Sequence, residues 1–166
     1  VVLFGQACTD EAPTGPALSD EAGLELRHGR GESDAITVMT QNLYVGADVD
    51  AVITALATPD PNDDIPALLD AVATIERTDF AARADAIAAE IRRTRPAVVG
   101  LQEVSTIGVD IPPLGVSLHV DFLPILLGAL TAEGLNYVVA IEYENFTASP
   151  APGISLTDAE AILVDA

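Results

Sequence analysis

The sequence has no lysine, only one cysteine and no long apolar run, and each absence excludes a class of protein. All seven cationic side chains are arginines, against 26 acidic residues, which gives a formal charge of −19. Non-specific binding to duplex nucleic acid needs a surface of cations that neutralise phosphates, so that class is excluded. Cys8 alone forms neither a disulfide framework nor a cysteine-based zinc site. No apolar run approaches the roughly 20 residues of a membrane-spanning helix.

The composition nevertheless supports a folded domain. Apolar residues make up 49% of the 166 residues, which is enough to bury a core and excludes wholesale disorder. The length suits one domain or a piece of a larger one. Because the chain is so acidic, a polyanionic substrate would have to be met by bound metal ions or by a local arginine cluster.

The first 34 residues differ in composition from the rest. Residues 1–8 are apolar and uncharged, as at the end of a secretory signal, and Cys8 follows small residues as at a bacterial lipoprotein processing site. This pattern predicts a secreted or cell-envelope lipoprotein with a possible membrane tether through Cys8. The alternative is an ordinary N-terminus with a free cysteine. Residues 9–34 are polar and contain prolines and glycines, which predicts a flexible linker.

From Ala35 onward, strand and helix patterns alternate. Apolar residues at helical spacing predict a helix over residues 79–94, with Thr78 or Asp79 as its cap and Pro96 as its stop. The other patterns predict helices at 48–57, 66–75 and 121–132, strands at 36–43, 97–104 and 136–146, a strand beginning at 161, and loops at 58–64 and 105–120. Strand, helices and strand in this order form a βαβ unit, so the fold class is α/β and its first two strands are parallel.

Two polar residues stand at the ends of the first two predicted strands. Asn42 ends the first, and Glu103 nearly ends the second, after a buried apolar run. Ligands of open α/β sheets gather at the carboxyl ends of the strands, so both side chains indicate one candidate site. A carboxylate that leaves such a run needs a partner, either an arginine or a divalent metal. The alternative is a solvated strand end.

Other polar residues indicate less. Calcium binding is one interpretation of five acids: Asp48, Asp50, Asp60, Asp63 and Asp64. No calcium-binding loop of the Asp-x-Asp-x-Asp-Gly type with a distal glutamate follows, so we interpret them as solvated acids. Ser105 has no histidine or acid at the spacing of a serine hydrolase. Tyr44 either lines a pocket or packs, and packing is favoured.

Two segments resemble a known family. They are Thr40-Gln41-Asn42-Leu43-Tyr44 and, after the helix, Arg95-Pro96-Ala97-Val98-Val99-Gly100-Leu101-Gln102-Glu103-Val104. They resemble the endonuclease/exonuclease/phosphatase superfamily, the DNase I-like metal-dependent phosphoesterases, over roughly residues 36–164. Ala97 stands where that family has aspartate.

The resemblance implies the first half of a four-layer α/β sandwich, apparently truncated. It also implies that Asn42 and Glu103 are catalytic, with Glu103 as ligand of Mg²⁺ (or Mn²⁺) and Asn42 positioning a metal-bound phosphate. Hydrolysis of a phosphate ester follows, with a nucleic acid, a phospholipid or a small phosphate as substrate. A hard cation with one or two carboxylates, water and substrate phosphate is ordinary Mg²⁺ chemistry.

Several of the family's motifs do not occur in the chain. Its Gly-Asp-x-Asn and Ser-Asp-His phrases are missing, and neither His28, in the predicted linker, nor His119, in a predicted loop, matches a catalytic histidine. The chain also stops within an apolar run. We therefore expect these 166 residues to be a piece that binds metal weakly and turns over little or nothing. The alternative is a secreted, lipid-tethered binding or scaffold module without catalysis.

Overall fold

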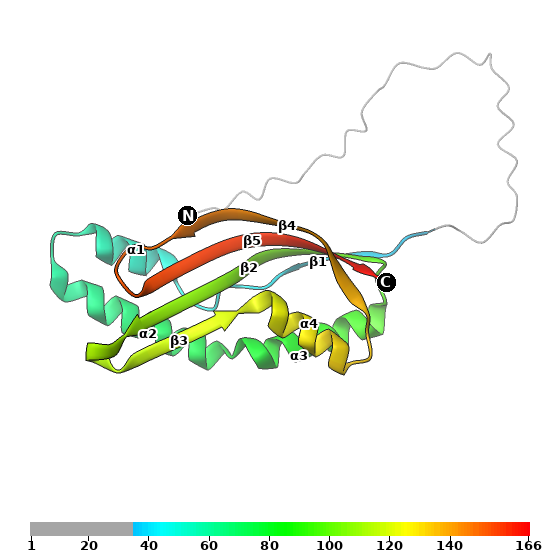
Figure 1. Cartoon of the computed structure of the whole chain (residues 1–166), viewed down its shortest axis with the longest axis horizontal. Coiled ribbons are helices and arrows are strands. Elements are labelled where there is room, and N and C mark those ends of the chain that lie inside the picture. The colour runs from blue at the N-terminus through cyan, green and yellow to red at the C-terminus, as the bar shows by residue number, and fades with distance from the viewer. Residues whose placement is uncertain (1–34) are drawn as a thin grey trace, which may run out of the picture. The chain divides into compact units, whose positions relative to one another are not determined.

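The computed structural model describes residues 35–166, which form a mixed α/β domain with a five-stranded mixed sheet (Figure 1). The predicted signal remnant at 1–8 with Cys8, the linker at 9–34 and His28 lie outside the described residues. The strands are β1 (Val38–Asn42), β2 (Val98–Ile111), β3 (Val116–Asp121), β4 (Tyr137–Ala148) and β5 (Ile154–Asp165). The helices are α1 (Val49–Ala57), α2 (Pro61–Thr78), α3 (Phe80–Thr94) and α4 (Phe122–Ala132), and η1 (Pro112–Leu114) is a 3₁₀ turn.

Strand β2 is the centre of the sheet. One edge of β2 pairs with β1 in parallel and, farther along, with β3 in antiparallel. The other edge pairs with β5, which in turn pairs with β4, both in antiparallel. The parallel pairing of β1 and β2 confirms the predicted βαβ unit, and Asn42 lies directly opposite Gln102.

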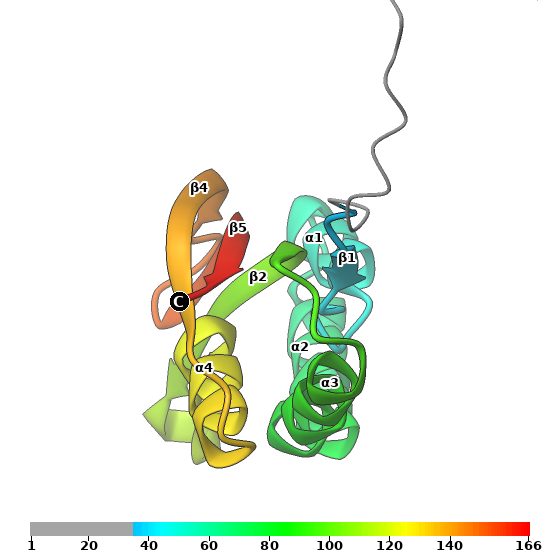
Figure 2. The same ribbon diagram turned by 90° about the vertical axis from the view of Figure 1, so that its right-hand side faces the viewer.

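A bulge in β2 shifts the alternation of its side chains, and its apolar residues on both faces belong to one hydrophobic core. Leu101 lies opposite Ala161 and Val104 opposite Ala159, so β2 takes three steps where β5 takes two. Strict alternation then places Ser105, Ile107 and Val109 on the face opposite to Leu101. Helix α4 contacts β2 and packs against α3, whereas α1 and α2 line a pocket with Ile107 and Val109. Figure 2 shows β2 crossing between β1, α1, α2 and α3 on one side and α4, β4 and β5 on the other.

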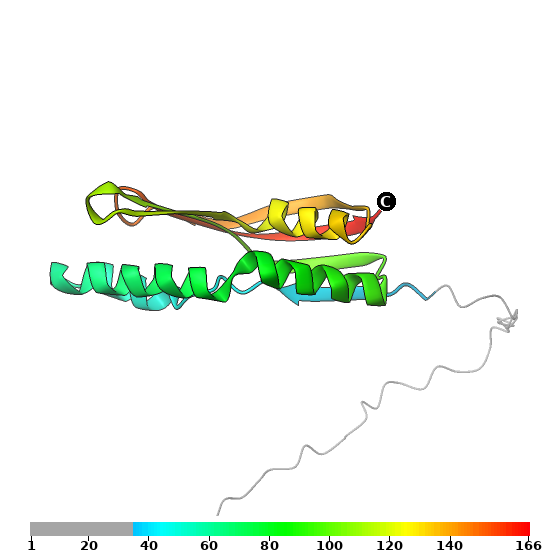
Figure 3. The ribbon, with the colours of Figure 1, turned by 90° about the horizontal axis from the view of Figure 1, so that it is seen from below.

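Helices α2 and α3 form one row, which α4 does not join. Seen from below, α2 and α3 follow one another in a line, and α4 lies beside the strands (Figure 3). The aromatic rings of Phe80 and Phe122 stack with centroids 3.7 Å apart, which joins the first turn of α3 to the first turn of α4. Such a pair adds about 0.5–1.5 kcal/mol beyond its buried area.

Two of the five acids considered for calcium, Asp48 and Asp60, are helix caps, and so is Asp79. Asp48 accepts a hydrogen bond from the amide of Ala51, Asp60 from Asn62 and Asp79 from Ala82, at 3.0–3.2 Å. A side-chain oxygen at this position satisfies one of the free N–H groups of the first turn. Asp79 is thus confirmed as the cap of α3.

Three sequence-based boundaries are wrong. The predicted loop at 105–120 holds the second half of β2 and all but the last residue of β3, because glycine and proline punctuate a hairpin there. Helix α2 runs over Pro61–Thr78 and not 66–75, because its prolines stand in its first two turns. Strand β5 begins at Ile154, seven residues before 161, since its alternating polar residues conceal the pattern.

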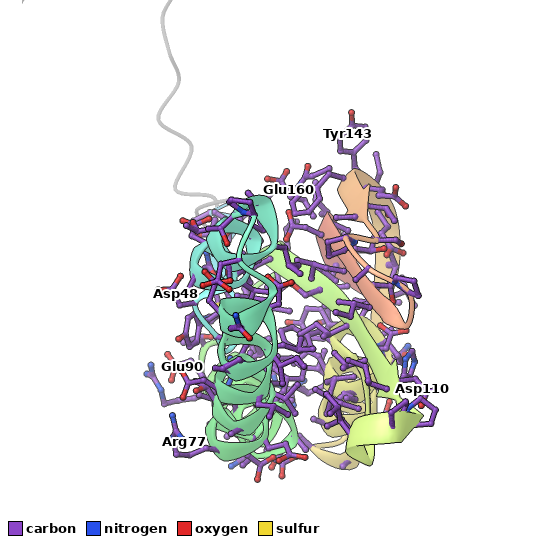
Figure 4. All side chains as sticks on the ribbon, turned by 90° about the vertical axis from the view of Figure 1, so that its left-hand side faces the viewer. Asp48, Arg77, Glu90, Asp110, Tyr143 and Glu160 are labelled. Carbon is purple, nitrogen blue, oxygen red and sulfur yellow. The ribbon has the colours of Figure 1, made fainter. Side chains whose placement is uncertain are left out.

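One part of the sheet has no helix over it. Val38, Val138, Ile141 and Ile162 share the Ile107 face in the half formed with β1, and all four are more than 40% exposed. Tyr143 projects from β4 in this region, away from the helices (Figure 4). Among the described helices, none has the length and apolarity needed to cross a membrane.

Candidate active site

The two predicted site residues are in contact. Asn42 Nδ2 donates a hydrogen bond of 2.7 Å to Glu103 Oε1, and the backbone amide of Val45 donates one of 2.9 Å to Glu103 Oε2. Asn42 Oδ1 in turn accepts from the amide of Tyr44 at 2.7 Å. The end of β1 and the loop after it therefore hold both carboxylate oxygens of Glu103.

Backbone strain gathers at this contact. Four residues other than glycine have positive φ angles among residues 35–166, and two of them, Asp79 and Arg95, cap helices. The other two are Tyr44 (φ 56°) and Glu103 (φ 54°), on either side of the hydrogen-bonded cluster. Each such conformation costs about 1–3 kcal/mol unless its surroundings impose it, and residues of this kind concentrate at functional sites.

Glu103 is the inserted residue of the bulge and does not end its strand. The sequence placed it near the strand's end, but β2 continues to Ile111. The bulge interrupts the ladder between Leu101 and Val104, and this interruption frees the glutamate to turn toward the β1 loop. The bulge thus directs the Glu103 side chain to the N–H donors of Asn42 and Val45.

Arg83 on α3 supports the β1 loop, and the sequence analysis missed it. Its guanidinium donates to the carbonyl oxygens of Leu43, of Tyr44 at 3.1 Å and of Thr78 at 3.0 Å. It also lies 5.6 Å from the centroid of the Tyr44 ring and 5.0 Å from that of Phe80. Burial lowers the pKa of Arg83, and nearby Tyr44 and Asp79 oppose part of that shift. An arginine remains charged throughout, so the clamp persists at neutral pH.

The Glu103 carboxylate faces an open hollow of about 460 Å³, which we call the acidic hollow. Residues from the β1 loop, α1, β2 and β5 line it, and its polar members are Tyr44, Asp48, Asp50, Glu103, Ser105 and Asp158. Asp158 comes from β5, directly opposite Ser105, and accepts a hydrogen bond of 2.8 Å from Asn145 Nδ2. No sequence motif marked Asp158, because it is brought here only by strand pairing.

The structure also locates the other residues considered from the sequence, Tyr44, Ser105 and His119. Tyr44 lines the hollow and is 50% exposed, so the prediction that it packs is wrong; the positive φ of Tyr44 turns its ring outward. Ser105 is 1% exposed, and its hydroxyl donates a hydrogen bond of 3.3 Å to the backbone oxygen of Glu103. Its role is therefore structural. His119 lies in β3 and lines a different hollow, beside Gly108.

The acidic hollow offers a metal only part of a ligand shell. Within residues 35–166, no three Asp, Glu, His or Cys side chains converge as a metal-binding group. The two ion pairs of this part of the chain, Arg92–Glu133 and Arg93–Glu90, do not involve Glu103. The arginine partner that the sequence left open for Glu103 is therefore replaced by two N–H donors.

Comparison with family models, with curated proteins and with solved structures finds no match to this chain.

Proposed function

We propose that the protein to which this chain belongs hydrolyses phosphate esters with the help of a divalent metal, and that Glu103 is a ligand of that metal. The observation that carries the proposal is the Asn42–Glu103 hydrogen bond between two parallel strands, with a strained glutamate at its centre. It supports the resemblance of both segments to the endonuclease/exonuclease/phosphatase superfamily. Their key residues are far apart in the sequence and adjacent in the fold.

The chemistry of Glu103 suits Mg²⁺ or Mn²⁺. Each of its oxygens accepts one N–H donor and keeps a further lone pair for a cation. Mg²⁺ commonly takes one or two carboxylates and completes its shell with water and substrate phosphate. Asp158 lines the same hollow and is the candidate for a second carboxylate. When bound, the metal would supply positive charge for the phosphate and a more acidic water.

The chain's own residues orient the Glu103 carboxylate and recognise the substrate phosphate. Val45 and Asn42 hold the Glu103 carboxylate, and Arg83 holds the loop that carries Val45. The second N–H of the Asn42 amide is a donor for a phosphate oxygen. The hollow contains no imidazole from residues 35–166, since His119 lines a different one. We therefore expect little turnover from these 166 residues alone.

The finer fold that we propose is the first half of a four-layer α/β sandwich. The exposed apolar side chains of the open sheet region, Val38, Val138, Ile141 and Ile162, support it. A sandwich needs such a face to receive a second sheet.

Metal binding to the 166-residue chain tests the site without requiring turnover. We expect Mn²⁺, followed by its paramagnetic signal, to bind the wild type and to bind Glu103→Gln at least tenfold more weakly. Glutamine keeps the shape and removes the charge. The matched control is Glu142→Gln, an exposed glutamate of β4 outside the acidic hollow, which should leave the Mn²⁺ affinity unchanged.

The full-length gene product tests the activity. Hydrolysis of a phosphodiester should require Mg²⁺ or Mn²⁺, stop in EDTA and fall about 10²-fold or more in Glu103→Gln. Equal Mn²⁺ affinity of wild type and Glu103→Gln would remove Glu103 from the metal site. Metal-independent behaviour throughout would favour the alternative, a binding or scaffold module.

A further inference from the structure

A second, apolar pocket of about 100 Å³ lies between α1 and α2 on one side and β2, β4 and β5 on the other. Its lining is aliphatic and aromatic, with Ser155 as its one hydroxyl-bearing residue. Val52, Ala71 and Ile107 belong to it alone, and none of them lines the acidic hollow. We call it the apolar pocket. A cavity of this kind stays dry and binds small apolar groups.

The apolar pocket and the acidic hollow share a wall. Six residues line both: Val45, Ala47, Val49, Ile53, Phe146 and Leu156. The site is therefore apolar at one end and, at the other, lined by the carboxylates of Asp48, Asp50, Glu103 and Asp158. Ligand sites are typically concave, mainly apolar and equipped with a few polar groups that fix orientation.

The charge of the polar end selects the kind of ligand. The charged side chains at the polar end are four carboxylates, and no arginine of residues 35–166 lines either hollow. Arg83, on α3, contacts the β1 loop, but its guanidinium donates to backbone carbonyl oxygens. An anionic head would meet repulsion, and a neutral head would leave the carboxylates unpaired. A cationic head is complementary to them.

We propose that the acidic hollow and the apolar pocket together bind a small amphiphilic cation, an alkylammonium whose head lies among the carboxylates and whose alkyl chain enters the apolar pocket. The proposal does not rest on the proposed hydrolysis, although it uses some of the same carboxylates. A divalent metal and the ammonium head would occupy the same carboxylates, so they compete.

Calorimetric titration of the 166-residue chain with alkyltrimethylammonium salts, in the absence of divalent metal, tests the proposal. Affinity should rise about fourfold per methylene from butyl to hexyl, the gain expected when a methylene leaves water for an apolar site. Tetramethylammonium should bind more weakly than either. Hexanol and hexyl phosphate should bind at least tenfold more weakly than hexyltrimethylammonium, because they lack the cation. Added Mg²⁺ should reduce the ammonium affinity.

Matched variants separate the two ends. Ile53 lines both hollows and is 52% exposed, so Ile53→Ser should weaken hexyltrimethylammonium several-fold and leave tetramethylammonium unchanged. Ile65 is 46% exposed on α2 and lines neither, so Ile65→Ser should change nothing. Asp50→Asn should weaken both ammonium ions, whereas Asp70→Asn, also exposed and outside both hollows, should weaken neither.

Three results would overturn the proposal. They are an absence of binding, hexyl phosphate or hexanol binding as tightly as the ammonium, and equal effects of Ile53→Ser and Ile65→Ser. All four substituted side chains are exposed, so neither pair opens the core. Loss of alkylammonium binding with retained Mn²⁺ binding would leave the proposed phosphoesterase site standing.

Discussion

The side chains of Asn42 and Glu103 are 61 positions apart in the sequence and joined by a hydrogen bond of 2.7 Å. The amide stands at the end of β1, and the carboxylate belongs to the inserted residue of β2. Parallel pairing alone would place Gln102 beside Asn42, and the bulge brings its neighbour into reach. The contact therefore depends on the strand pairing and on the bulge together.

Asn42→Asp would replace this hydrogen bond by two adjacent carboxylates. We expect the free energy of unfolding to fall by about 1–3 kcal/mol at neutral pH, from the lost bond and the repulsion. Part of it should return below about pH 4, where carboxyl groups are protonated. Urea denaturation at pH 7 and pH 4 measures both effects. Asn145→Asp, beside Asp158, is the comparison and should cost less: the Val45 amide holds the Glu103 carboxylate beside Asn42, whereas within residues 35–166 Asp158 has no such backbone donor. Equal losses of unfolding free energy in both variants would show that the Asn42–Glu103 contact is no more important for stability than the Asn145–Asp158 contact.

Arg83→Lys should destabilise the fold although it keeps the charge. Lysine cannot reproduce the three carbonyl contacts of the guanidinium, to Leu43, Tyr44 and Thr78. We expect a loss of about 2 kcal/mol in chemical denaturation. Arg77→Lys, which removes one exposed contact to Thr74, should change stability by less than about 0.5 kcal/mol. If both variants lose the same amount, the clamp on the β1 loop is not what stabilises it.

Gly153→Ala and Gly128→Ala should have opposite signs. Gly153 has a φ of 80°, and a Cβ there would stand 2.1 Å from the carbonyl oxygen of Asp110, in the turn between β4 and β5. Gly128 lies within α4, and a Cβ there has no heavy atom within 4 Å. Thermal unfolding should show a lower Tm for Gly153→Ala and a stabilisation of about 0.5–1 kcal/mol for Gly128→Ala. A neutral Gly153→Ala would contradict the close approach.

Tyr137 makes stability depend on alkaline pH. Burial first, and the nearby Asp165 second, raise the pKa of its phenol, whose hydroxyl donates to the carbonyl oxygen of Pro96. The unfolded chain loses this proton near pH 10 and the folded chain loses it later, so the unfolded state binds fewer protons in that range. Stability is therefore retained below about pH 10 and falls as the pH rises through the folded pKa. Denaturation curves from pH 8 to pH 11 should show a smaller alkaline loss in Tyr137→Phe, which itself costs about 1 kcal/mol at pH 8.

Periodic patterns predicted the part of the fold that local sequence determines. Helix α3 was predicted at nearly its observed bounds, because its spacing, its cap Asp79 and its stop Pro96 agree. The second half of β2 was missed because Gly108 and the prolines after Ile111 resemble a loop. Those residues become a strand through pairing with β3 and β5, which no local pattern records.

The site divides in the same way. The proximity of Asn42 and Glu103 could be predicted because each follows an apolar run in one of two parallel strands, although Glu103 stands at a bulge and not at the end of β2. Asp158 and Arg83 could not, because one arrives by antiparallel pairing and the other by a reach of 40 positions to a backbone carbonyl. The sequence also left open which group pairs with the Glu103 carboxylate. The structure shows two hydrogen-bond donors, the Asn42 side-chain amide and the Val45 backbone amide.

The inserted residue at Glu103 places the length of β2 under a parity rule. The extra residue lets Leu101 and Val104, three positions apart, share one face, so deletion of Glu103 alone would leave Ser105, Ile107 and Val109 on their present face. Deletion of Thr106, beyond the bulge, would instead turn Ile107 and Val109 away from α2. Insertions or deletions of two residues beyond the bulge should be tolerated far better than those of one.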